Sequence, residues 1–306
     1  MSVERTVSVN GVELCTQAFG EPGDPALLLV AGMSSPMDWW EEEFCERLAA
    51  GRRHVVRYDL RDTGRSTTYP PGRPGYTGAD LRQDVVSLLD ALGIREVHLV
   101  GVSMGAGMAQ CVAVEHPDRV RSLTLIDTTA ALPGAPEGLP GMDPELSAYL
   151  AAAQGRAEPD WSDRTAVVEW SVQEQRAFRR AGFDETRVRR VATQIVDRSV
   201  DIAAILNHAH LDPGPDPEGS LADIVAPTLV VHGTADPLFP LAHGEALAAA
   251  IPNAALLPLQ GVGHELPPPE HWDRVIAALL QHTSGDYEPA ELPCLSDAAV
   301  SGDGTG

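Results

Sequence analysis

The pattern of apolar and polar residues at the start of the chain predicts a β-hairpin followed by a buried strand. The two types alternate over Thr6–Val9 and Val12–Ala18, and Asn10-Gly11 between them supplies the positive φ angles of a two-residue turn. Residues Ala26–Val30 then form an unbroken apolar run of strand length. A strand covered on both faces has this composition, and such strands are typical of parallel sheets.

Beyond this run, strand-like and helix-like segments follow one another in turn. We expect helices at Trp39–Ala49, Ala79–Leu92 and Met104–Glu115, and strands at His54–Tyr58, Val97–Val102 and Leu123–Ile126. Such alternation is the mark of right-handed βαβ crossovers. The sequence therefore predicts an α/β fold with a mostly parallel, doubly wound sheet and an N-terminal β-hairpin.

The alternation of strand-like and helix-like segments stops over residues 131–222. Strand-like runs are replaced there by charged helical stretches such as Thr165–Phe178 and Glu185–Asp197. We expect this segment to form a helical cap inserted into an α/β core made of residues 1–130 and 223–283. Strands and helices resume at Thr228–Val231, Ala242–Ile251, Ala255–Pro258 and Glu270–His282. Residues 284–306 are rich in small, acidic and proline residues, so we expect a disordered tail.

Composition narrows the function classes. The chain has 306 residues, with 44 Asp and Glu against 22 basic residues, and its net charge of −22 argues against a nucleic-acid or anionic-membrane surface. The four cysteines are far apart and include no C-x-x-C pair, which favours a reducing compartment over a disulfide framework or zinc cage. Met1–Arg5 is charged and no apolar span follows. We expect a cytoplasmic protein, a monomer or weak homo-oligomer, with no cofactor, metal, nucleic-acid or membrane partner.

The strongest chemical signal is Gly101-Val102-Ser103-Met104-Gly105, which lies between a predicted strand and a predicted helix. A G-x-S-x-G nucleophile elbow requires that context, because the serine occupies a strained turn that two glycines make room for. The N–H groups that begin the following helix favour negative charge that develops nearby. Ser103 is therefore the candidate nucleophile.

A serine hydroxyl needs an imidazole to take its proton and a carboxylate to orient that imidazole. In this topology the chain order is serine, acid, histidine. His264 follows the last predicted strand and is the candidate base, whereas His98 and His232 lie inside apolar strands and read as core residues. Asp236 follows a strand and precedes His264 by 28 positions, which is room for one helix and one strand.

Asp127 remains a rival acid, because it ends the strand Leu123–Ile126. We favour Asp236, whose turn fits the partner order of the elbow better. An oxyanion hole needs two backbone donors, and the N–H groups of Met104, after the serine, and of Met33, after the first parallel strand, are the candidates.

These motifs resemble those of the α/β-hydrolase superfamily over Val3–His282. Asp59–Ser66 is similar to the structural Asp-x-Arg-x-x-Gly-x-Ser loop of that family. More narrowly, the chain resembles the anthracycline methyl esterases of the aclacinomycin type from actinomycetes in three stretches, Gly23–Val30, Tyr58–Thr68 and His243-Gly244 with Ile251-Pro252.

The resemblance implies a carboxylic ester hydrolase that removes a methyl ester from an anthracycline-type polyketide in antibiotic biosynthesis, with Ser103, Asp236 and His264 as its triad. Two other enzymatic interpretations use the same residues, a cofactor-free perhydrolase (haloperoxidase) and a C–C hydrolase or lactonase. A non-catalytic binding protein is a third alternative, because this scaffold also hosts receptors.

Overall fold

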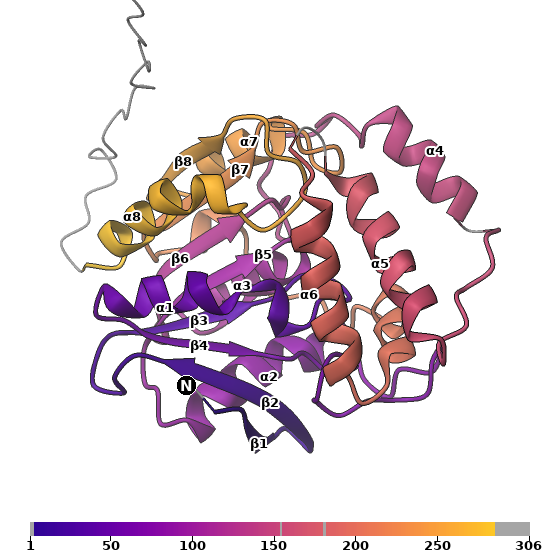
Figure 1. The fold of residues 1–306 in the computed structure, drawn as a ribbon. Coiled ribbons are helices and arrows are strands. Elements are labelled where there is room, and N and C mark those ends of the chain that lie inside the picture. Colours follow the sequence, from indigo (N-terminus) through magenta and orange to yellow (C-terminus); the bar gives the residue numbers. More distant parts are fainter. Residues whose placement is uncertain (1–2, 154, 180–181, 285–306) are drawn as a thin grey trace, which may run out of the picture.

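The computed structural model describes residues 3–153, 155–179 and 182–284, and its centre is one twisted sheet (Figure 1). The sheet order is β1-β2-β4-β3-β5-β6-β7-β8. β1 and β2 form an antiparallel hairpin, β2 joins β4 antiparallel, and every later pairing is parallel. The strands are β1 Arg5–Val9, β2 Val12–Phe19, β3 Ala26–Val30, β4 His54–Tyr58, β5 Val97–Val102, β6 Val120–Ile126, β7 Thr228–Gly233 and β8 Ala254–Leu259.

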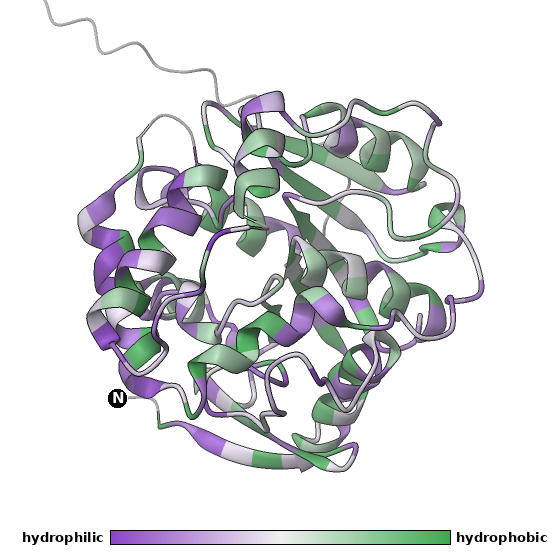
Figure 2. Cartoon of the chain, turned by 90° about the vertical axis from the view of Figure 1, so that its right-hand side faces the viewer, coloured by the Kyte–Doolittle hydropathy of each residue, from purple (hydrophilic) through white to green (hydrophobic). Residues whose placement is uncertain are grey.

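The parallel strands are predominantly apolar because helices cover both faces of the sheet. In β3, Leu28 and Val30 belong to one hydrophobic cluster, and Leu27 and Leu29 belong to the cluster on the opposite face. Side chains alternate between faces along a strand, so a strand covered on both faces has apolar residues at most positions on both sides. Figure 2 shows the strands at the centre predominantly hydrophobic and the surrounding helices mixed.

Five helices cover the sheet. Residues of α2, α3 and α7 contribute to the first cluster, and residues of α1 and α8 to the second. Their bounds are α1 Glu42–Ala50, α2 Gly78–Ala91, α3 Met104–Glu115, α7 Ala242–Ala250 and α8 Trp272–His282. Strands β3 to β8 all run parallel to one another and therefore end at one common edge, from which the loops that carry the candidate site residues emerge.

Residues 131–222, which we call the helical segment, follow β6 and precede β7. Their described part forms α4 Pro144–Ala153, α5 Arg164–Phe178, α6 Glu185–Arg198 and the 3-10 helices η2 Ile202–His210 and η3 Leu221–Asp223. α5 and α6 lie side by side (Figure 1) and share a small apolar cluster that includes Val168, Val172 and Val188.

Helix α6 is attached to the core through its last residue. The Arg198 guanidinium, 8% exposed, pairs with Asp38 at 2.7 Å, with Glu4 at 2.6 Å and with Asp59. Asp59 belongs to the loop that resembled a structural motif, and its carboxylate also accepts the backbone N–H groups of Met37 and Arg65. Buried charges that are paired several times in this way hold one arrangement of two elements.

Most predicted elements agree with the structure, and the differences have local causes. The helix expected at Trp39–Ala49 begins at Glu42, because a 3-10 turn, η1 Met37–Trp39, ends at Trp40, where a ψ of 80° leaves the helical region. β6 begins at Val120, three residues before the predicted start at Leu123. The exposed Arg121 interrupts the apolar run there, so the beginning of the strand has no apolar pattern in the sequence. Helix α4 was not predicted.

The expected disordered tail lies, from residue 285 onward, outside the described residues. Among the helices that the structure does describe, none has the length and apolar character needed to cross a bilayer.

Candidate active site

Ser103 occupies a strained turn between β5 and α3, with φ 52° and ψ −119°. A Cβ on Gly101 would lie 2.5 Å from the Gly105 carbonyl oxygen, and a Cβ on Gly105 would lie 2.4 Å from the Ala31 carbonyl oxygen. Both glycines are therefore required by the close approach of strand, helix and neighbouring loop, as predicted. The Ser103 N–H donates to Ile126 at 2.9 Å, which ties the turn to β6.

His264 lies between Ser103 and Asp236. Its Nε2 is 3.0 Å from the Ser103 hydroxyl oxygen, and its Nδ1 is 2.8 Å from Oδ2 of Asp236. A carboxylate can only accept, so Nδ1 carries the ring proton and Nε2 is the acceptor for the serine hydroxyl. The imidazole is thus in the tautomer that a general base for Ser103 requires.

Hydrogen bonds hold the Asp236 side chain in place beside His264. Its side chain is fully buried, and Oδ1 accepts the backbone N–H groups of Leu238 at 2.8 Å and Phe239 at 2.9 Å. The loop that carries Asp236 contacts the loop that carries His264, because Ala235 N–H donates to Val262 at 3.0 Å. The carboxylate therefore has a fixed position and three donors.

No hydrogen bond joins Asp127, the rival acid, to His264 among the described residues. Its Oδ1 accepts the Gly233 N–H at 2.7 Å, and the backbone of Glu265 also interacts with the carboxyl group. Complete burial and the nearby Asp236 carboxylate raise the pKa of Asp127 well above its usual range. A carboxyl group in this position is stabilised in its protonated form, and its hydrogen bond to Gly233 helps to hold the loop that carries Asp236.

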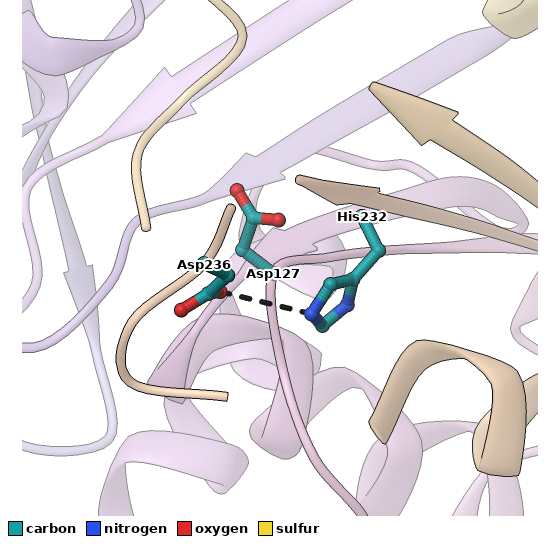
Figure 3. A group of neighbouring side chains, drawn as sticks. All are labelled: Asp127, His232 and Asp236. Carbon is teal, nitrogen blue, oxygen red and sulfur yellow. Dashed lines mark ion pairs between the residues drawn. The ribbon is translucent and has the colours of Figure 1, made fainter. Parts of the chain in front are cut away.

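Asp127, His232 and Asp236 form a group whose ligand-type atoms lie within 4.8 Å of one another (Figure 3). Nε2 of His232 is 2.7 Å from the Phe239 carbonyl oxygen and 3.7 Å from Asp236. Facing a carbonyl, that nitrogen is protonated and donates. All three side chains are thus engaged in hydrogen bonds that orient the Asp236 loop, and we assign the group that supporting role.

The candidate oxyanion loop follows β3. A Cβ on Gly32 would lie 3.4 Å from the Cβ of Ser103, so the loop passes close to the nucleophile. The backbone N–H groups of Met33 and Met104 make no hydrogen bond to another described residue. Both are therefore available as donors. The next residue, Ser34, has a φ of 56° and contacts η2 of the helical segment.

The helical segment also touches the candidate base, which sequence reasoning did not predict. His264 N–H donates to the Phe178 carbonyl at 2.9 Å, and the Phe178 ring lies 6.0 Å from the imidazole. On the other side the Phe239 ring, from the loop of Asp236, lies 5.5 Å away. The contacts of Phe178 join residues far apart in the chain. No periodicity or motif in the sequence signals them.

Comparison with known proteins identifies the family. A family model described as the alpha/beta hydrolase fold matches residues 25–269. The chain belongs to the α/β-hydrolase family. The matched span includes the loops of Ser103, Asp236 and His264 and the whole helical segment.

Curated relatives of this α/β hydrolase include esterases. The chain is 31% identical over 293 residues to the rhodomycin D methylesterase DauP of Streptomyces sp. (strain C5), covering 91% of this chain and 97% of that protein. It is 30% identical over 295 residues to the rhodomycin D methylesterase DnrP of Streptomyces peucetius, with the same coverage. The resemblance to methyl esterases is confirmed, and these relatives support an ester hydrolase activity.

Solved structures confirm the fold. An enol-lactonase from Burkholderia xenovorans LB400 superposes with a TM-score of 0.70 at 23% identity, covering 92% of this chain and all of that one. A 2-hydroxy-6-oxo-6-phenylhexa-2,4-dienoate hydrolase from Rhodococcus sp. strain RHA1 has the same TM-score at 22% identity, covering 93% and 99%. At these identities the likeness concerns the fold alone.

Proposed function

We propose that this α/β hydrolase is a serine-dependent carboxylic ester hydrolase that removes a methyl ester from an anthracycline-type polyketide. The observation that carries the proposal is the placement of His264 between Ser103 and Asp236, with 3.0 and 2.8 Å contacts. The substrate class is supported by the similarity to rhodomycin D methylesterases. The net charge of −22 suits a neutral or cationic substrate.

In this proposal the reaction has two halves. His264 Nε2 takes the proton of Ser103 as Oγ attacks the ester carbonyl carbon, and the N–H groups of Met33 and Met104 stabilise the oxyanion. The intermediate collapses by breaking the bond to the methoxy oxygen, which leaves as methanol with the proton from His264. Water, deprotonated by the same nitrogen, then attacks the acyl-enzyme and releases the carboxylic acid and Ser103.

We further propose that the helical segment, residues 131–222, acts as a cap over a core of residues 1–130 and 223–283 and shapes the substrate pocket. Helix α5 reaches His264 through Phe178, and η2 reaches the oxyanion loop through Ser34. Substrate preference should therefore depend on this segment, because it borders both the base and the oxyanion loop.

The test is to incubate the protein with carbomethoxylated anthracyclines and with p-nitrophenyl esters. We expect the anthracycline to lose its ester methyl group by mass spectrometry and the activated esters to give a burst of p-nitrophenol as the acyl-enzyme forms. Ser103→Ala should lower kcat about a millionfold. Near-wild-type turnover by Ser103→Ala would contradict the assignment of Ser103 as the nucleophile. Hydrolysis of activated esters without demethylation of the anthracycline would contradict the proposed substrate class.

The same preparations separate the alternatives. Peroxide-dependent halogenation of a dye in preference to hydrolysis would indicate a perhydrolase, and cleavage of lactones or of C–C bonds in preference to methyl esters would indicate those hydrolase types. The absence of a burst with every activated ester would indicate a binding protein.

A further inference from the structure

The Gly32–Ser35 turn, which carries the candidate oxyanion donor Met33, is held from outside by η2 of the helical segment. Ser34 N–H lies 2.8 Å from Nδ1 of His208, and the Ser34 hydroxyl donates to the Ile205 carbonyl at 2.7 Å. Ser35 N–H closes the turn on the Gly32 carbonyl at 3.3 Å. The N–H and the hydroxyl of Ser34 therefore both bond to a segment about 170 residues away in the chain.

The partners of His208 define its tautomer. A backbone N–H can only donate, so Nδ1 must be unprotonated. Nε2 lies 2.8 Å from the Arg61 carbonyl oxygen, which can only accept, so Nε2 carries the proton. Both bonds are possible only with a neutral ring. His208 is 3% exposed, and burial lowers its pKa, although the hydrogen bond to the Arg61 backbone and the nearby Asp62 act in the opposite direction. The lowered pKa preserves the neutral form.

Ser34 needs such a restraint. Its φ of 56° lies in the left-handed region, which costs a residue other than glycine about 1–3 kcal/mol unless the surroundings hold it there. Without the two bonds to η2, Ser34 would relax toward a negative φ. That rotation would turn the Met33–Ser34 peptide, which adjoins Ser34, and through the Met33 backbone it would shift the next peptide, Gly32–Met33, which carries the Met33 N–H.

The support behind His208 is itself rigid. The neighbouring Asn207 is fully buried, donates to Oδ2 of Asp62 at 3.0 Å and accepts the Gly72 N–H at 2.6 Å. These bonds fasten η2 to the loops that follow β4. His208 thus links a fixed part of the core to a strained turn beside the nucleophile.

We propose that His208 is a positioning residue for the oxyanion hole: its unprotonated Nδ1 holds the Ser34 N–H and thereby fixes the Gly32–Ser35 turn with the Met33 N–H directed at the reacting carbonyl. This inference rests on the proposed function. It assigns to the helical segment a part in transition-state stabilisation, in addition to any part in substrate selection.

Two substitutions of His208 separate its two bonds. His208→Asn places an amide oxygen near the position of Nδ1 and keeps the acceptor for Ser34, whereas His208→Gln places an amide nitrogen near the position of Nε2 and keeps only the bond to Arg61. A matched control is His98→Gln. His98 is also 3% exposed and loses an Nδ1 bond, to the Ser122 hydroxyl at 2.8 Å, at the other end of β5 from the site.

The measurements are kcat for p-nitrophenyl butyrate per titrated active site, the melting temperature, and the inhibition constant of an alkyl boronic acid, whose tetrahedral adduct on Ser103 places an oxygen in the oxyanion hole. Removing a whole oxyanion donor costs 10²–10³ in kcat in a comparable enzyme, so His208→Gln, which only loosens one, should cost about 10- to 100-fold. Boronic acid affinity should fall by the same factor, and His208→Asn should stay within about threefold of wild type. His98→Gln should lower only the melting temperature.

Equal behaviour of His208→Gln and His208→Asn would overturn the inference, and so would a loss in His208→Gln that leaves boronic acid affinity unchanged. Should His208→Gln fail to fold, His208→Leu supplies the second test, because it fills the same buried space with an apolar group and also removes the acceptor for the Ser34 N–H. Its kcat and boronic acid affinity should fall together, and no fall would overturn the inference. A wild type without any Ser103-dependent burst would instead remove the proposed function.

Discussion

Arg179 and Glu265, the residue after the candidate base, form an ion pair with 3.0 Å between Nη1 and Oε2. Their side chains are only 3% and 7% exposed. Arg179 follows α5, and Glu265 follows His264, so the pair joins the helical segment to the loop of the base. Burial lowers the pKa of Arg179 to about 10 and raises the pKa of Glu265, so desolvation outweighs the attraction between the two charges.

Arg179→Met should leave Glu265 buried without its partner and lower the free energy of unfolding by about 3–5 kcal/mol. A raised folded-state pKa means that the contribution of Glu265 to stability is present at low pH and is lost as the pH rises through that pKa. The defect should therefore be larger at pH 8 than at pH 5. Urea titrations at both pH values measure it.

The double variant Arg179→Met/Glu265→Leu is the matched control. Replacing a buried pair by apolar groups is often neutral, so this variant should recover most of the stability that Arg179→Met loses. A double variant as unstable as Arg179→Met would show that the ion pair is not what the single substitution disrupts.

Asp127→Asn and Asp236→Asn should separate the two candidate acids. Asp236→Asn should lower kcat about ten-thousandfold, because it loses the carboxylate that orients His264. Asp127→Asn keeps an oxygen for the Gly233 N–H and should retain turnover. The raised pKa of Asp127 makes its ionised form costly, so the variant should be more stable than wild type, by a margin that grows as the pH rises.

Steady-state kinetics and thermal melts between pH 5 and 8 make this comparison. If Asp127→Asn were as inactive as Asp236→Asn, the result would indicate that Asp127 acts as the acid of the triad.

Gly105→Ala should damage the nucleophile elbow, whereas Gly107→Ala, two residues further along α3, should not. The first Cβ would lie 2.4 Å from the Ala31 carbonyl oxygen and 2.6 Å from that of Val30, both backbone atoms. We expect a loss of about 1–3 kcal/mol and of most activity. The Gly107 Cβ would meet only the Ala131 Cβ at 3.4 Å, and alanine favours the helix by up to about 1 kcal/mol.

Denaturation curves and p-nitrophenyl ester turnover distinguish the two variants. Wild-type activity in Gly105→Ala would mean that β3 and α3 can separate without moving Ser103.

Acid should destabilise the core through its buried histidines. Burial lowers the pKa of His282 from 6.5 to about 4 and that of His98 to about 3. A depressed folded-state pKa means that this stability is present above pH 6.5 and is lost as the pH falls toward 4, by about 1.4 kcal/mol per pH unit for each histidine. His282→Gln keeps a donor for the Leu123 carbonyl, which His282 contacts at 3.0 Å, and does not titrate.

The expected result is that wild type loses more stability than His282→Gln between pH 7 and 4.5, measured as free energies of unfolding in urea. Parallel loss in both proteins would show that His282 is already protonated in the folded state or that other groups dominate the transition.

Strands such as Ala26–Val30 and helices such as Met104–Glu115 were predicted to within a residue, because apolar periodicity is a local property of the chain. Errors occurred where a local pattern was interrupted, as by the exposed Arg121 at the start of β6. Ser103, Asp236 and His264 could be chosen from a motif and a chain order, since each follows a strand that ends at the same edge of the sheet.

The sequence by itself determined the α/β alternation, the strained serine turn and the short set of groups able to meet at the sheet edge. Only the tertiary structure decided that His264 contacts Asp236 and not Asp127, that Arg179 pairs with Glu265, and that His208 holds Ser34. Each of these is a contact between polar groups that are wholly or partly buried, and two of the three join positions more than eighty apart. Burial forces such groups to find partners, but which partner each one meets depends on how the helical segment packs on the sheet.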